Sequence, residues 1–169
     1  MKKAFLLFSS FFILSGCGNV QGNNESESAP EETTTENTGV TNVIENDDFL
    51  IEITDVWLED GQYNDGEIIV FKYDYTNKTD ENIGVDTNWM FLISAVQDND
   101  ENTINSLRLT SPKDYGLEEY AEVKPGGTMA YGQAYELDDD FTPVTLTATE
   151  FAGDEFWSNE YDITNLEKR

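Results

Sequence analysis

The sequence predicts an all-β fold, an antiparallel β-sandwich of about seven or eight strands without a disulfide bond. Apolar and polar residues alternate along several segments, which is the period of a half-buried strand. Clusters of Gly, Asn, Asp and Pro separate these segments at short intervals, as expected for turns. The 169 residues contain one Cys, which excludes an intramolecular disulfide. These features place the fold in residues 48–169, which provide enough chain for one hydrophobic core.

The alternation is clearest in residues 67–76, where Ile69, Phe71, Tyr73 and Tyr75 share one face. The same period predicts strands at residues 49–54, 104–109, 128–137, 144–151 and 155–163, and a short edge strand at residues 40–44. Residues 88–97 are apolar on both faces, which predicts a central strand. The best helix candidate is residues 113–123, but Gly116 and its short length weaken it.

Residues 1–16 are predicted to be a lipoprotein signal peptide. Two Lys residues follow Met1, and residues 4–14 form an apolar run, too short for a membrane-spanning helix of about 20 residues. Leu14, Ser15 and Gly16 then precede Cys17, and this tetrapeptide resembles the lipobox of bacterial lipoproteins. The resemblance implies that the Cys17 thiol receives a diacylglycerol group and becomes the first mature residue. Acyl chains such as palmitate would then hold the chain on the membrane. The alternative is cleavage nearby and plain secretion.

The segment after Cys17 is predicted to be a disordered acidic tether that ends at residue 47. Residues 18–47 contain seven acidic residues and no basic or aromatic ones. Such a composition buries too little apolar surface to offset the entropy lost on ordering. We therefore expect three parts: a signal peptide (1–16), the lipidated Cys17 with its tether (17–47) and the β-sandwich (48–169).

Composition excludes several classes of function. The chain has 9 basic and 35 acidic residues and no His, which gives a net charge of −26. Nucleic-acid binding needs clustered Lys and Arg, so no nucleic-acid partner is expected. Without His, a Ser-His-Asp triad and His-based metal sites are absent. No Gly-x-Ser-x-Gly elbow or phosphate-binding Gly loop occurs, so we predict no catalytic residue, no cofactor and no enzyme activity.

The acidic turns are candidate calcium-binding sites. Residues 98–102 begin like an EF-hand loop, but Thr103 and Leu109 stand where that loop needs Gly and Glu. The turns at residues 60–65 and 138–140 are looser candidates, and solvated turn carboxylates explain them equally well. We therefore predict no metal ligand. Paired carboxylates of a hydrolase cannot be told from chance among so many acidic residues.

The aromatic residues allow two interpretations. Tyr73, Tyr75, Tyr131 and Tyr135 alternate on two predicted strands, either as a core face or as an exposed ladder that binds sugars or peptides. The core face is the preferred interpretation, with Trp57, Trp89 and Trp157 as core anchors. Phe156 precedes Trp157, so in regular β structure one of the two must face outward.

The order of these features resembles a domain family of unknown function on Gram-positive surface lipoproteins. The matching stretches are residues 69–77 (IVFKYDYTN), 123–127 (VKPGG), 135–139 (YELDD) and 143–150 (PVTLTATE). The resemblance implies an immunoglobulin-like sandwich, close to the telokin-like lipoprotein domains, and an extracellular location. It implies no catalytic residue.

The expected function is that of a non-catalytic surface module, anchored to the outer face of the cell membrane through the lipid on Cys17. Its partner would be a cell-envelope component or a cationic protein. Two alternatives stay open: a cell-envelope hydrolase or hydrolase-assisting domain with paired carboxylates, and an acidic surface protein with a purely structural role.

Overall fold

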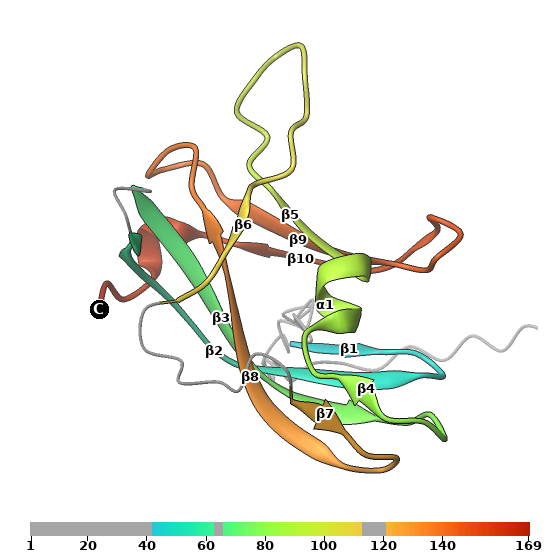
Figure 1. The fold of residues 1–169 in the computed structure, drawn as a ribbon. Helices are drawn as coiled ribbons and strands as arrows, with labels where there is room; N and C mark the ends of the chain where they lie inside the picture. Colours follow the sequence, from blue (N-terminus) through green and yellow to red (C-terminus); the bar gives the residue numbers. More distant parts are fainter. Residues whose placement is uncertain (1–41, 63–65, 113–120) are drawn as a thin grey trace, which may run out of the picture. The chain divides into compact units, whose positions relative to one another are not determined.

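The computed structural model describes residues 42–62, 66–112 and 121–169, which belong to one compact unit. Its strands form three antiparallel sheets with the orders β1-β2-β3-β8-β6, β10-β9-β5 and β4-β7 (Figure 1). The strands are β1 (Val43–Glu45), β2 (Phe49–Asp60), β3 (Glu67–Asn77), β4 (Ile83–Gly84), β5 (Ile93–Val96), β6 (Leu109–Thr110), β7 (Glu122–Val123), β8 (Thr128–Glu136), β9 (Val144–Thr149) and β10 (Glu155–Tyr161). The helix α1 spans Thr87–Leu92, and the 3-10 helix η2 spans Ile163–Asn165.

The predicted all-β sandwich is confirmed. The main core cluster takes side chains from the five-stranded sheet, such as Ile51 and Phe71, and from the three-stranded sheet, such as Leu146 and Ala148. The two sheets therefore enclose one hydrophobic core (Figure 1). The described residues form ten strands rather than the predicted seven or eight. The number is higher because it includes β4, β6 and β7, which are each only two residues long.

The strands at the centre of the large sheet have the period that the sequence predicts. In β3 the face with Ile69, Phe71 and Tyr73 joins the main core, while Ile68 and Val70 join a smaller cluster on the other face. In β2 a register shift between Ile53 and Asp55 changes which side chains face the core. Trp57 therefore lies in the smaller cluster.

The four alternating tyrosines form a core face, as preferred above. Tyr73 and Tyr75 have no exposed surface, and Tyr131 and Tyr135 are buried as well. Register pairs Tyr73 with Tyr131 across β3 and β8, and their ring centroids lie 6.0 Å apart. The alternative of an exposed tyrosine ladder is thereby excluded.

The prediction of a central strand over residues 88–97 is wrong. Residues 87–92 form α1, and the strand that follows is the edge strand β5. Six residues are too few for a stable isolated helix, so contacts with the sheets must hold it. The Trp89 indole N–H donates to the Tyr135 hydroxyl at 3.0 Å, and the Asn88 amide donates to the Tyr75 hydroxyl at 2.8 Å.

Phe156 and Trp157 are both partly buried against the core, so neither faces fully outward. A register shift between Glu155 and Trp157 in the pairing of β10 with β9 gives Phe156 no partner position. This bulge removes the strict alternation on which the expectation of an outward-facing aromatic residue rested.

Asn77 explains why an Asn turn and a Pro-Gly turn occur together in the sequence. Its side-chain amide donates to the carbonyls of Glu81 and Val123, at 2.7 and 2.8 Å, and its side-chain oxygen accepts from the backbone N–H of Thr79. Its backbone pairs with Gly126 and Gly127. Gly126 has a φ of +70°, which suits the third position of a type II turn after Pro125.

β1 pairs with β2, so strand structure begins before residue 48, at the edge where the sequence predicts a short strand. Ile44 of β1 is fully buried. Cys17 and the signal peptide lie outside the described residues, as does most of the tether. The helix candidate at residues 113–123 also falls largely outside them, and its last two residues form β7.

Candidate functional site

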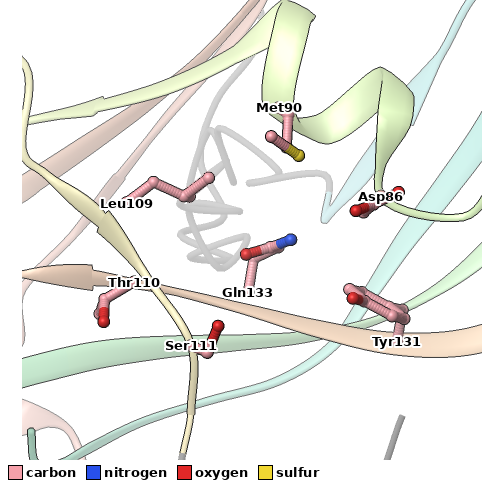
Figure 2. Close-up of a pocket in the computed structure, with 7 residues that line it drawn as sticks. All are labelled: Asp86, Met90, Leu109, Thr110, Ser111, Tyr131 and Gln133. Atoms are coloured by element: carbon pink, nitrogen blue, oxygen red, sulfur yellow. The ribbon is translucent and has the colours of Figure 1, made fainter. Parts of the chain in front are cut away.

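A pocket with a volume of about 300 Å³ opens beside β8. Its wall is formed by the start of α1, by β6 and the residue after it, and by the inner face of β8 (Figure 2). The lining residues are Asp86, Met90, Leu109, Thr110, Ser111, Tyr131 and Gln133. This volume lies at the lower end of the range for ligand pockets, about 300–1,000 Å³.

Gln133 is the distinctive residue of this pocket. It is one of three buried polar residues in the described chain, together with Asn77 and Gln97. The side chains of Asn77 and Gln97 each make several hydrogen bonds. The Gln133 side chain is 7 % exposed and has no hydrogen-bond partner among the described residues. Figure 2 shows its carboxamide pointing into the space between Asp86, Met90 and Leu109.

Asp86 supplies a second polar group without a partner. It directly precedes α1, is partly buried, and makes no side-chain hydrogen bond to the helix backbone. Its carboxylate also has no ion pair among the described residues. Buried polar groups are nearly always bonded in folded proteins, whereas partly buried ones can bond to solvent. Because neither Gln133 nor Asp86 has a side-chain partner among the described residues, their polar atoms are available to water or to a ligand in the pocket.

The layer beneath the pocket is aromatic. The Tyr73 hydroxyl is buried and has no hydrogen-bond partner in the described structure. Burial raises the pKa of Tyr73 well above its ordinary value, and the nearby Tyr131 and Asp86 raise it further. Burial likewise raises the pKa of Tyr135. Both phenols therefore stay neutral near pH 7, and neither provides a base.

The remaining lining groups are apolar side chains and hydroxyls. Met90 and Leu109 provide apolar contact surface, and Thr110 and Ser111 provide hydroxyls. Among the described residues that line the pocket, Asp86 is the sole carboxylate, so they contain no acid–base pair of the kind that glycoside hydrolysis uses.

The acidic turns singled out in the sequence use their carboxylates to hold the backbone. In the turn at residues 98–102, Asp100 accepts from the backbone N–H groups of Asn102 and Thr103, which lowers its pKa. Asp139 accepts from the backbone N–H groups of Phe141 and Thr142 and from the Asn99 amide. Desolvation raises the pKa of Asp139, but these hydrogen bonds outweigh it and lower the pKa to about 2.

The turn at residues 60–65 lies partly outside the described residues, and within them Asp60 forms an ion pair with Lys168 at 3.1 Å. In the parts of the chain that the structure covers, no three acidic, Cys or His side chains are grouped as a metal site would require. Nor do these parts contain a helix of sufficient length and apolar character to cross a bilayer.

Sequence reasoning placed Tyr131 and Gln133 on one face of their strand without selecting Gln133 as a site residue. The available signal was a polar residue between two tyrosines, at a position that the alternation assigns to the core. The sequence does not indicate Asp86 as a site residue, because its position beside β8 depends on helix α1, which was not predicted.

Comparison with known families identifies the relationship of this chain. The family described as "Domain of unknown function (DUF5067)" matches residues 23–150. The chain belongs to the DUF5067 family. The match includes α1, β6 and β8, so every residue that lines the pocket lies within the DUF5067 region, whereas β10 follows it.

One solved structure is similar in fold to this chain. It is described as a "putative lipoprotein" from Staphylococcus aureus subsp. aureus NCTC 8325, with 24 % sequence identity and a TM-score of 0.62. The similarity covers 75 % of this chain and 92 % of the other. At this identity the likeness shows a common fold. A search of curated proteins found no match.

Proposed function

We propose that this DUF5067 chain is a non-catalytic binding module with an immunoglobulin-like sandwich, held at the outer face of the cell membrane by a lipid on Cys17. The observation that carries the binding role is the unpartnered Gln133 carboxamide in the pocket beside β8. A ligand that enters the pocket would supply the hydrogen bonds that the described residues do not give this carboxamide.

The sequence before the described residues supports the anchoring role. Cys17 ends a lipobox-like tetrapeptide after a short apolar run, and it is the single Cys of the chain. The lipoprotein description of the structural neighbour agrees with this location. The high acidity of the chain would keep the domain away from anionic lipid headgroups, with the pocket accessible to soluble ligands.

Thermal melting of the full-length chain in detergent, with a panel of small molecules grouped by charge, tests the binding role. The panel contains neutral polyols, alkylamines, carboxylates and inorganic phosphate. A ligand that binds only the folded state raises the melting temperature, so at least one group should raise it by about 3 °C or more at saturation. Replacement Gln133→Met keeps the size of the side chain but removes the amide, and it should abolish that rise.

The matched control is Thr147→Val, an isosteric loss of a hydroxyl in β9, a strand that does not line the pocket. This variant should respond to the ligand like the wild type. If no group of compounds stabilises the wild type, the binding role is wrong and a structural role for the acidic domain takes its place. If Gln133→Met responds like the wild type, the pocket is not the binding site.

A further inference from the structure

The described residues that line the pocket contribute charge of one sign. Asp86 is the sole charged side chain among the described residues that line it, and no Lys or Arg is among them. Arg108 lies just before β6, but it pairs with Glu136, to which its Nε donates at 2.7 Å. The chain as a whole has a net charge of −26. Among the described lining residues an anionic ligand would meet the Asp86 carboxylate and no cation, so their electrostatics disfavours it.

The groups in the pocket accept hydrogen bonds in the number that an ammonium group needs. A primary ammonium has three N–H donors and no acceptor. The Asp86 carboxylate can accept one of these bonds, with full charge compensation. The Ser111 hydroxyl can accept a second, and the Gln133 carbonyl oxygen can accept the third after a half-turn of its carboxamide, whose nitrogen lies on the Asp86 side in Figure 2.

The apolar part of the pocket matches the stem of such a ligand. Met90 and Leu109 lie on the wall next to Asp86 and Gln133 (Figure 2). An alkyl chain that ends in an ammonium group buries its methylene groups on apolar surface while the charge reaches a polar partner. Quaternary ammonium groups are instead recognised by several aromatic faces, and Tyr131 is the single aromatic residue in the described lining.

We propose that the pocket binds a primary alkylammonium group, with Asp86 as its counter-ion and Gln133 as a hydrogen-bond acceptor. This inference rests on the proposed binding function and names its ligand class. The ammonium group belongs either to a free amine or to a lysine side chain of a peptide, since both present the same chemistry to Asp86.

The test is isothermal titration calorimetry on the full-length chain in detergent at constant ionic strength and pH 7. The probes are 1,5-diaminopentane as a free amine and Nα-acetyl-lysine amide as a peptide unit. Nα,Nε-diacetyl-lysine amide is the uncharged comparison. An alkyl amine with a pKa of about 10.4 carries its charge at this pH. At least one charged probe should bind tenfold or more tightly than the uncharged one. The charged probe that binds more tightly shows whether the ammonium group belongs to a free amine or to a lysine side chain.

Asp86→Asn should weaken binding of the charged probe at least tenfold. Asp80→Asn removes the same charge from an exposed turn outside the pocket, and it should change affinity less than twofold. Ser111→Ala should weaken binding by a smaller factor. Unchanged melting temperatures of the variants without ligand would show that they fold.

Equal affinity for charged and uncharged probes, or equal effects of Asp86→Asn and Asp80→Asn, would overturn the ammonium assignment. If a neutral polyol then stabilises the wild type but not Gln133→Met, the binding function stands and its ligand class is different. If neither the amines nor any compound of the melting panel binds, the binding function itself fails.

Discussion

The indole ring of Trp89 lies flat on the phenol ring of Tyr73, with ring centroids 4.4 Å apart and planes inclined by 12°. This contact joins α1 to the centre of β3 and hence fixes the position of Asp86, the residue before the helix. The Trp89 N–H donates to the Tyr135 hydroxyl, which in turn donates to the carbonyl of Ile93 at 3.2 Å. The geometry of the pocket therefore depends on the aromatic core below it.

Two hydroxyl deletions in this core should have opposite outcomes. Tyr135→Phe removes a hydroxyl with two buried partners and leaves both unsatisfied, so it should lower the free energy of unfolding by about 1–3 kcal/mol. Tyr73→Phe removes a hydroxyl without a partner and should leave stability unchanged or raise it. Urea denaturation of both variants measures the difference. Equal losses would show that a partner absent from the described structure, such as water, bonds to Tyr73.

Replacing Asn77 should separate two turns that its side chain holds together. Asn77→Ala removes the amide that donates to the carbonyls of Glu81 and Val123 and the oxygen that accepts from the Thr79 N–H, and it should lower the free energy of unfolding by more than about 2 kcal/mol. Asn82→Ala is the control, because Asn82 is exposed and makes one side-chain bond, to Glu122. It should change stability by less than about 0.5 kcal/mol. Similar losses in both variants would contradict the role given to Asn77.

Acid should remove the contribution of Asp139 to stability. Its pKa in the folded protein is about 2, below the ordinary value of 3.8, so the ionised form favours the folded state. The contribution is complete above about pH 4 and is lost as the pH falls toward 2. The stability difference between the wild type and Asp139→Asn should therefore shrink over that range, as measured by urea midpoints. A stability difference that stays constant from about pH 5 to pH 2 would contradict this role of Asp139.

Lipidation of Cys17 should be visible in cells. Cys17→Ala removes the single thiol of the chain, so metabolic labelling with a lipid analogue should disappear. The variant should appear in the medium or remain as an uncleaved precursor. Cell fractionation and labelling give the two readouts, and Ser10→Ala within the signal region is the control. Equal labelling of the wild type and Cys17→Ala would exclude the anchor.

The strands at the centre of the large sheet could be predicted because local pattern and final environment agree there. In β3 alternate residues meet the core, as the sequence order of Ile69, Phe71 and Tyr73 indicates, and in β8 Tyr131 and Tyr135 do so. The helix α1 could not be predicted, since its residues are apolar on two faces and Trp89 favours the helix only through partners distant in sequence. The bulge at Phe156 could not be predicted either, because it depends on how β10 pairs with β9.

The pocket was predictable only in part. Gln133 breaks an apolar alternation and could be recognised as unusual from the sequence alone. Whether such a residue finds a partner depends on its three-dimensional neighbours: Gln97 finds Asp138 and Thr142, whereas Gln133 finds none among the described residues. Sequence shows that a buried amide is present, and the structure shows which one is unsatisfied.

The attachment of β1 has a mechanical consequence. A pulling force transmitted through the residues before Asn42 enters the fold at β1, a three-residue strand at the edge of the large sheet. β1 is held by its pairing with β2, by the burial of Ile44 and by the Lys78–Glu45 ion pair at 3.1 Å. The neighbouring β2 and β3 pair along most of their length. We therefore expect β1 to detach before β2 and β3 under load, while the pocket beside β8 keeps its shape.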